Sequence, residues 1–132
     1  MNEPQWLTLE LVIDMHAEQL ALFGGPAGIR DQGMLESALG RPQNNFAYGE
    51  HDLAALAAAY AFGIARNRPF IDGNKRAALA ALIVFFNLNG VDLLVPQADM
   101  TAAILAVAAG EAEEDVLAQW LRDQLAQSTR RR

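Results

Sequence analysis

Residues 66–76 bring together the side chains of this sequence that are best suited to binding an anion. The segment reads Arg-Asn-Arg-Pro-Phe-Ile-Asp-Gly-Asn-Lys-Arg, and four basic residues against one acid leave a local charge of 4 − 1 = +3. A helix beginning at Asn74 would direct free backbone N–H groups and a partial positive charge at this segment. Gly73 leaves room for a ligand to approach the backbone, and Lys75 and Arg76 add full charges. The pattern predicts a cradle for a small anion such as a nucleotide phosphate.

Three further residues of the segment have an expected role. Asp72 is the candidate metal ligand, because Mg²⁺ is commonly held by one or two carboxylates together with substrate phosphates. Phe70 offers an apolar anchor that would fix the loop to the core. Asn74 has two interpretations: it bonds a phosphate oxygen, or it is the N-cap of an ordinary helix start, with Gly73 as the turn residue. Spacing leaves both open, and the segment lacks the spaced glycines and the Ser or Thr of a Walker loop.

Lys75 is the single lysine of the chain, because nine of the ten basic residues are arginine. A compact ammonium and a planar guanidinium are not interchangeable where a ligand must fit closely. The lysine therefore either marks a position at which arginine cannot serve, or is there by chance.

Outside this segment the charge is acidic. Residues 1–65 carry two basic residues against eight acids, and residues 77–129 carry one against seven, so each region has a charge of −6. This distribution argues against broad contact with a nucleic-acid backbone. Residues 130–132 are all arginine.

Length and composition limit the class of protein. The 132 residues, 52% of them hydrophobic, suit one domain with a core, and the absence of cysteine excludes disulfides and zinc sites built on cysteine. The longest apolar run, Ala77–Phe86, is about half of what a membrane-spanning helix needs. The N-terminus opens with Asn, Glu and Pro after the Met, not with a basic and then apolar signal. We expect a cytoplasmic protein.

Helical periodicity runs through the whole chain. Thr8, Asp31 and Asp52 are candidate N-caps, and six helices are expected, over residues 9–23, 32–40, 53–66, 74–88, 98–109 and 113–127. Residues 42–51 should be irregular because Pro42 ends the second helix, and 91–95 is the nearest strand candidate. The fourth helix lacks a polar face and should be the buried centre of the domain. The prediction is an all-α single domain with a core over 7–127 and a disordered basic tail over 128–132.

Residues 68–76 resemble the signature of the Fic/Doc family, His-x-Phe-x-(Asp/Glu)-(Ala/Gly)-Asn-(Lys/Gly)-Arg. The resemblance extends over residues 7–127 and is closest to the Doc, or death-on-curing, branch. Besides the motif it is carried by His16, Gly24-Gly25, the Gly28–Asp31 stretch, the Leu35–Pro42 segment and Asn89-Gly90. It implies a Fic/Doc-like helical bundle.

The resemblance also implies a reaction. Most Fic proteins have Gly where this chain has Lys75, and transfer AMP from ATP. Doc-like members have Lys, bind the nucleotide inverted, and present its γ-phosphate to a hydroxyl of a translation factor, elongation factor Tu, which arrests translation. AMP-transferring members also have a second Arg shortly after Arg76, and here Ala77 to Ala80 contain none. The resemblance therefore implies a phosphotransferase toxin using ATP and Mg²⁺, with AMP transfer as the alternative.

It implies a partner and further site residues as well. Doc-like toxins are paired with a Phd-like antitoxin, whose C-terminal segment folds into a groove near the site. Asp72 and Lys75 would act in catalysis, and Gly73, Asn74, Lys75 and Arg76 would bind phosphate. Arg66 resembles an arginine found at this position in Doc proteins, and it either reaches a phosphate or is a charge at the C-terminal end of a helix. His16 is expected to have a structural hydrogen-bonding role.

Arg68 is the departure from the motif. The family has His at this position as the general base that takes a proton from the attacking hydroxyl. A guanidinium stays protonated at ordinary pH and cannot accept that proton. We therefore expect an inactivated copy, arising either from a detoxifying change or as a natural pseudoenzyme. A catalytically dead module that binds an antitoxin or a nucleotide is the alternative function.

Overall fold

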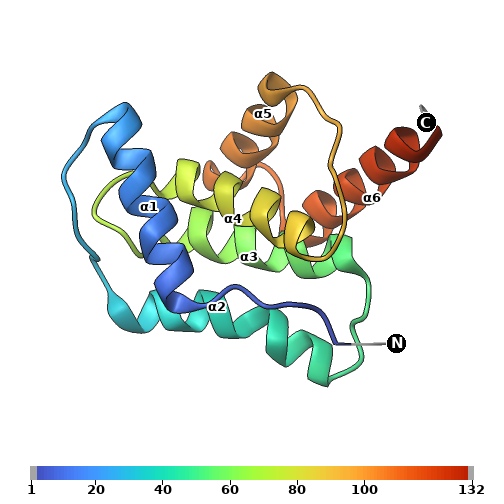
Figure 1. Ribbon diagram of the computed structural model, residues 1–132, viewed down its shortest axis with the longest axis horizontal. Helices are drawn as coiled ribbons and strands as arrows, with labels where there is room; N and C mark the ends of the chain where they lie inside the picture. The colour runs from blue at the N-terminus through green and yellow to red at the C-terminus, as the bar shows by residue number, and fades with distance from the viewer. Residues whose placement is uncertain (1–2, 131–132) are drawn as a thin grey trace.

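The computed structural model describes residues 3–130, which form six α-helices (Figure 1). The helices are α1 (Leu9–Phe23), α2 (Gln32–Ala47), α3 (Leu53–Asn67), α4 (Asn74–Leu88), α5 (Gln97–Ala108) and α6 (Glu114–Arg130). The all-α prediction is confirmed. Within residues 3–130 the single β-bridge pairs Ile29 with Phe70, and residues 91–95 form no strand. No helix in this range has the length and hydropathy that crossing a membrane requires.

The three predicted N-caps are present. The Thr8 hydroxyl accepts from the N–H of Leu11 at 3.1 Å, and the Asp31 carboxylate accepts from the N–H of Met34 at 3.0 Å. The Asp52 carboxylate accepts from the N–H of Ala54 at 3.2 Å. Each hydrogen bond satisfies one of the N–H groups in a first helical turn that have no partner within the helix. The beginnings of these three helices could therefore be predicted from the sequence.

Two predicted boundaries were wrong. The second helix does not end at Pro42 but continues to Ala47, because Pro42 is buried in the core and Phe46 packs edge-on against Trp6, with ring centroids 5.6 Å apart. A proline inside a helix costs a backbone hydrogen bond, and these tertiary contacts offset that loss. The last helix continues to Arg130, so residues 128–130 are helical and not part of a disordered tail. Residues 131–132 lie outside the described range.

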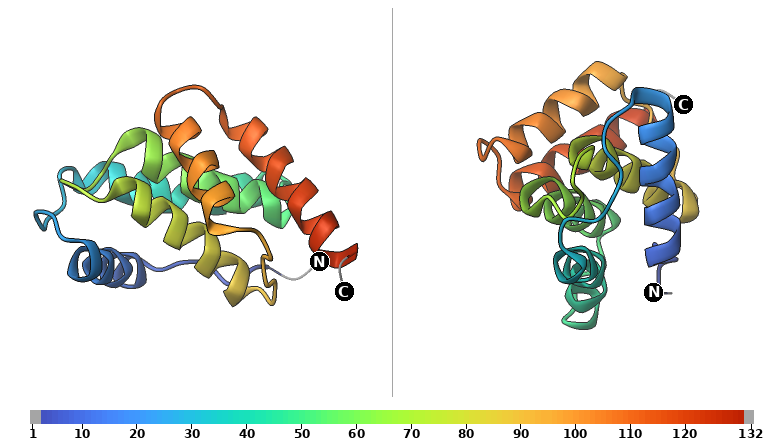
Figure 2. Two further views of the ribbon diagram at one scale, coloured as in Figure 1. Left: turned by 90° about the horizontal axis from the view of Figure 1, so that it is seen from above. Right: turned by 90° about the vertical axis from the view of Figure 1, so that its left-hand side faces the viewer.

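Helices α3 and α4 run antiparallel through the middle of the bundle, and the other four helices surround them (Figures 1 and 2). The central position predicted for the fourth helix is confirmed, since its inner residues are buried: Ala77, Ala78, Ala81, Leu82, Phe85 and Phe86. Alanine and glycine let neighbouring helices approach closely. A Cβ added at Gly63 of α3 would lie 3.0 Å from the Cβ and 3.2 Å from the Cα of Ala38 on α2.

The N-terminal segment before α1 is bound to the central helices. The Asn89 side chain accepts from the N–H of Gln5 at 2.8 Å and donates to its carbonyl at 3.1 Å. Trp6 stacks on Phe85 with ring centroids 6.1 Å apart, and the Tyr60 hydroxyl accepts from the N–H of Leu7 at 3.1 Å. Trp6 thus packs on the core, and so does Trp120, which is half-buried against it.

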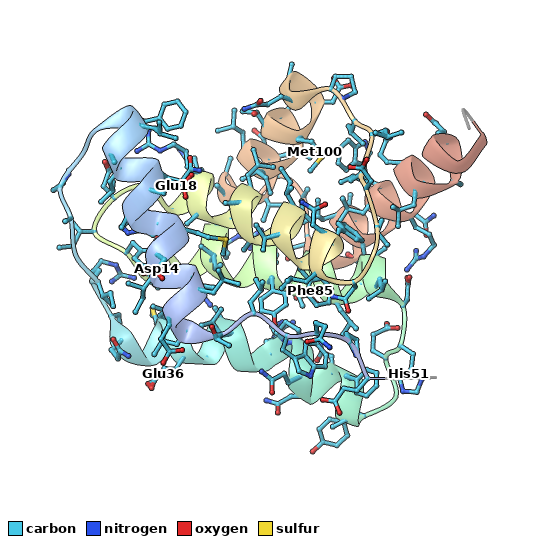
Figure 3. The ribbon with its side chains drawn as sticks, in the orientation of Figure 1. Asp14, Glu18, Glu36, His51, Phe85 and Met100 are labelled. Carbon is cyan, nitrogen blue, oxygen red and sulfur yellow. The ribbon has the colours of Figure 1, made fainter. Side chains whose placement is uncertain are left out.

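The outer faces of the helices carry the acidic charge. Asp14 and Glu18 on α1 and Glu36 on α2 are exposed and project from the bundle (Figure 3). The basic segment therefore lies in an acidic surrounding, at the end of the bundle where α3 meets α4.

Candidate active site

The six-residue loop 68–73 joins the end of α3 to the start of α4. Its first residue, Arg68, has φ 53° and ψ 59° and donates its N–H to the carbonyl of Ile64 at 3.1 Å. Among residues 3–130 it is the one non-glycine residue with positive φ. A left-handed backbone costs an L-residue roughly 1–2 kcal/mol, so contacts from elsewhere in the fold must hold position 68 in place.

Asn74 closes the loop. Its Oδ1 accepts from the N–H of Phe70 at 2.8 Å, and its Nδ2 donates to the carbonyl of Phe70 at 2.9 Å. Asn74 is 8% exposed and Phe70 is 1% exposed, so this pair of hydrogen bonds lies in the core. The N-cap of α4 is Gly73, with φ 77° and no side-chain cap, and Asn74 is the first helical residue. The side chain of Asn74 therefore shapes the loop, and neither of its two predicted roles describes this contact.

His16 supports the loop from α1. Its ring stacks on Phe70 with centroids 3.7 Å apart and planes 7° apart, and Nε2 lies 2.7 Å from the carbonyl oxygen of Asp72. A carbonyl can only accept, so Nε2 carries the proton and donates. The buried histidine has the structural hydrogen-bonding role expected of it.

The acid and the last basic residue of the motif face the segment that follows α1. The Asp72 carboxylate is 49% exposed, and its Oδ2 lies 3.9 Å from Arg76 Nη2. Gly25 has φ 115°, a backbone conformation that L side chains rarely adopt, and a Cβ there would displace the Asp72 carboxylate. The Arg76 guanidinium lies over the Phe23 ring, 5.4 Å from its centroid, and Nη2 donates to the carbonyl of Gly24 at 3.4 Å.

A hollow of about 770 Å³ opens between the loop, the start of α4 and α5. It brings together six predicted site residues: Arg68, Asp72, Gly73, Asn74, Lys75 and Arg76. Three of these are basic, and the acids on the wall are Asp72 and Glu111, so the lining has a charge of 3 − 2 = +1. Within the described part of the chain no hydrogen bond or ion pair engages the Lys75 ammonium. The hollow suits an anion.

Arg66 is not brought to this hollow. Its Nε donates to the carbonyl of Val107 at 3.0 Å and its Nη2 to the carbonyl of Ala112 at 3.1 Å, and the guanidinium lies over the Phe62 ring. Nη2 also lies 3.5 Å from the Glu113 carboxylate. Arg66 thus ties α3 to the connection between α5 and α6. The position of Arg66 in the last turn of α3 matches the alternative of a helix C-terminal charge. Because the carbonyls of Val107 and Ala112 and the Glu113 carboxylate engage its donors, a contact between Arg66 and phosphate stays a prediction.

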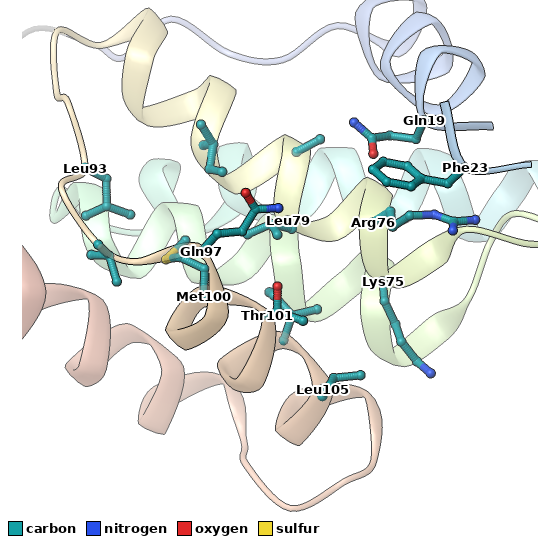
Figure 4. A pocket seen from close by; sticks show the side chains of 14 residues that line it. Gln19, Phe23, Lys75, Arg76, Leu79, Leu93, Gln97, Met100, Thr101 and Leu105 are labelled. Carbon is teal, nitrogen blue, oxygen red and sulfur yellow. The ribbon is translucent and has the colours of Figure 1, made fainter. Parts of the chain in front are cut away.

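A second, largely apolar groove of about 450 Å³ lies on the other side of the start of α4 (Figure 4). Helices α1 and α5 and the segment before α5 form its walls. Lys75 and Arg76 line both the groove and the hollow. Figure 4 shows Arg76 beside Phe23, while Lys75 extends away from that ring. A ligand in the groove and a ligand in the hollow would therefore meet at these two cations.

No cluster of three or more His, Asp or Glu residues that could hold a metal is present among residues 3–130. Asp72 is the acid at the start of α4, and a single carboxylate fits Mg²⁺ only where phosphate oxygens and water complete the shell.

Sequence reasoning missed two parts of the site. One is the wall supplied by α5, where small residues such as Ala102 and Ala106 leave the hollow open. The other is Arg30, whose guanidinium bonds the backbone at the end of α3. Neither has a local signal, since alanines on a helix and an exposed arginine in a loop are common features of surfaces.

Comparison with known proteins agrees with this geometry. The model of the Fic/DOC family matches residues 6–86, more than half of the 132 residues. The chain belongs to the Fic/DOC family. The matched range includes the whole Fic/DOC motif, all of α3, and α4 as far as Phe86, while α5 and α6 lie beyond it.

Two curated relatives show the branch. "Protein kinase doc" of Escherichia phage P1 is 36% identical over 116 residues, 86% of this chain and 90% of that protein. "Toxin Doc" of Mycolicibacterium smegmatis is 45% identical over 74 residues, 54% of this chain and 56% of that protein. This Fic/DOC member is therefore Doc-like, and its relatives include a toxin and a kinase.

Proposed function

We propose that this chain is the toxin of a toxin–antitoxin pair, built to transfer the γ-phosphoryl group of ATP to a hydroxyl of a translation factor, elongation factor Tu. We propose further that the chain with Arg68 binds the nucleotide and does not turn it over. One observation carries the proposal. Position 68 lies on the wall of a cationic hollow, where a hydroxyl group needs a proton acceptor, and it holds a permanent donor instead.

Nucleotide binding is supported by the start of α4. Gly73 has no side chain to cap the helix, so the N–H groups of the first turn have no side-chain acceptor, and such groups attract phosphate. Lys75 and Arg76 add charge on the wall of the same hollow. Because the Asn74 amide bonds Phe70, its contribution to phosphate binding would come from its backbone N–H.

When bound, ATP with Mg²⁺ supplies a transferable phosphoryl group and shields part of its charge. The half-exposed Asp72 carboxylate is the residue that would hold the metal, and the loop keeps it at the start of α4. The residue at position 68 has to take the hydroxyl proton, which histidine does and arginine does not.

Phosphoryl transfer is favoured over AMP transfer by the residues after the motif. AMP-transferring members have a second arginine shortly after the motif, and Ala77 to Ala80 contain none. Lys75 occupies the hollow where most Fic proteins have glycine, and its side chain reduces the space beside the first turn. Both features support the inverted orientation, with the γ-phosphate presented.

The expected experiment is Arg68→His in the purified chain, incubated with elongation factor Tu and ATP labelled in the γ position. Label should appear on the elongation factor with the histidine form and be absent with Arg68. The matched control is Arg41→His, which places a histidine on the exposed face of α2. Transfer from α-labelled ATP would indicate AMP transfer, and no transfer of either label by the histidine form would contradict the enzymatic proposal.

Binding is measured separately, by calorimetry with ATP and Mg²⁺ on the chain as it stands. Lys75→Ala should weaken the affinity about tenfold, equivalent to about 1.4 kcal/mol, since it removes an unpaired charge from the hollow. Arg41→Ala, at a residue that does not line the hollow and is paired with Glu114, should leave the affinity unchanged. If ATP does not bind at all, even after Arg68→His, the nucleotide site itself is refuted.

The apolar groove supports the antitoxin part of the proposal. A Phd-like segment folding as an amphipathic helix would place its apolar face against α1, α4 and α5. Ile83→Glu puts a charge into this groove at a partly exposed position. In the Arg68→His form it should leave toxicity intact and abolish rescue by a co-expressed antitoxin from the neighbouring reading frame. Unchanged rescue would exclude this groove as the docking site.

A further inference from the structure

We infer that Arg30, in the segment between α1 and α2, is a positioning residue that sets the backbone of position 68 and so aims its side chain at the hollow. The catalytic part of this inference rests on the proposed function. The structural part does not.

The Arg30 guanidinium forms two hydrogen bonds to the carbonyls of consecutive residues. Arg30 Nε donates to the carbonyl of Arg68 at 2.7 Å, and Nη2 donates to the carbonyl of Asn67 at 2.7 Å. These are among the carbonyls that the C-terminus of α3 leaves without a helical partner. A single planar guanidinium satisfies both with fixed geometry, which an ammonium cannot do. Arg30 also neutralises part of the negative end of the α3 dipole.

The backbone of the same segment extends this contact along the loop. The N–H groups of Arg30 and Asp31 donate to the carbonyl of Pro69 at 2.7 and 3.0 Å. The N–H of Ile71 donates to the carbonyl of Gly28 at 3.1 Å. The carbonyl of residue 68 is therefore bound by the Arg30 side chain, and the carbonyl of the next residue, Pro69, is bound by the backbone of Arg30 and Asp31. Asp31 in turn caps α2.

Position 68 needs such support. A residue before proline normally takes an extended backbone, and a left-handed one is costly for any side chain with a Cβ. Asn74 and His16 hold only the later part of the loop, at Phe70 and Asp72. Without Arg30, the backbone at position 68 could return to the extended region, which would turn the side chain of arginine or histidine away from the hollow.

The first test uses structure alone. Arg30→Met keeps the apolar length and removes both donors, and Arg41→Met is the control on another exposed arginine. Crystal structures of the two variants should show residue 68 outside the left-handed region in the first and unchanged in the second. A φ near 53° at position 68 in Arg30→Met overturns the inference. Thermal unfolding of both variants confirms that they fold.

The second test uses the Arg68→His background and separates positioning from stability. Arg30→Met should lower kcat for phosphoryl transfer at least tenfold and change the KM for ATP less than threefold. Arg30→Lys should restore at most a small part of kcat, since an ammonium lacks the fork. An unchanged kcat overturns the inference. If Arg68→His alone shows no transfer, the proposed function fails, and the crystal structures still decide the role of Arg30.

Discussion

At the scale of single residues, the site depends on side chains that hold the backbone as much as on those that would meet a ligand. Asn74, His16 and Arg30 each form hydrogen bonds with backbone groups of the loop 68–73 or of Asn67, the residue just before it. Arg68, whose carbonyl is among these groups, and Lys75 line the hollow. The motif asparagine reads in sequence as a phosphate ligand or a helix cap, and the structure shows why it is needed even without a ligand.

Asn74→Ala should therefore destabilise the protein itself. It leaves the buried N–H and carbonyl of Phe70 unpaired. At about 1–3 kcal/mol for each of these two groups, the free energy of unfolding should fall by about 2–6 kcal/mol. Urea denaturation monitored by circular dichroism measures this. Asn87→Ala, on the exposed face of the same helix, should change the value by less than about 0.5 kcal/mol. Equal effects of the two substitutions would show that the two hydrogen bonds to Phe70 contribute nothing to stability.

At the scale of elements, helix contacts decide where the site residues are. Gly63 lets α3 lie directly against α2, whose beginning carries Asp31 and follows Arg30. The same α2 continues through Pro42, against local preference, because the proline and Phe46 pack on other elements. Propensity thus predicts where α2 begins, and packing determines where it ends.

Substitutions at two glycines should change the free energy of unfolding in opposite directions, because Gly63 lies at the contact between α2 and α3 and Gly40 does not. Gly40 of α2 has open space around it, so Gly40→Ala should raise the free energy of unfolding by about 0.5–1 kcal/mol through helix propensity alone. Gly63→Val would force its side chain into the Ala38 backbone and should lower it by about 1–3 kcal/mol. Thermal denaturation should order the variants as Gly40→Ala, parent, Gly63→Val. A Gly63→Val protein as stable as the parent would disprove the tight contact.

At the scale of the whole molecule, the N-terminal segment joins the core through Tyr60. The Tyr60 hydroxyl is buried and accepts from the N–H of Leu7. Desolvation raises the pKa of Tyr60 to about 12, and the bond from Leu7 lowers it by a smaller amount. Burial thus keeps this tyrosine neutral well above the pH at which it ionises in the unfolded chain.

Because the pKa of Tyr60 is raised in the folded state, its contribution to stability is fully present below the unfolded pKa, near 10. This contribution is lost as the pH rises to the folded-state pKa of about 12. Tyr60 alone should account for a loss of about 2–3 kcal/mol across this window. The free energy of unfolding of Tyr60→Phe should be about 1 kcal/mol lower at pH 8, because the hydrogen bond from Leu7 is lost. It should then decline less steeply than that of the parent as the pH rises. Urea unfolding between pH 8 and 12 measures both profiles, and parallel curves would contradict the role of Tyr60.

The sequence by itself was enough to predict six helices, three of their caps and the motif segment, because capping, periodicity and charge are local properties. It also identified six residues of the hollow, since they are neighbours along one loop and one helical turn. Tertiary structure alone decided that Arg66 turns to the α5–α6 connection, that Asn74 bonds Phe70 and that α5 completes the wall. The role of Arg30 was also decided there, because the carbonyls it binds lie 37 and 38 positions away along the chain, and hydrogen bonds over such separations leave no periodic or compositional trace.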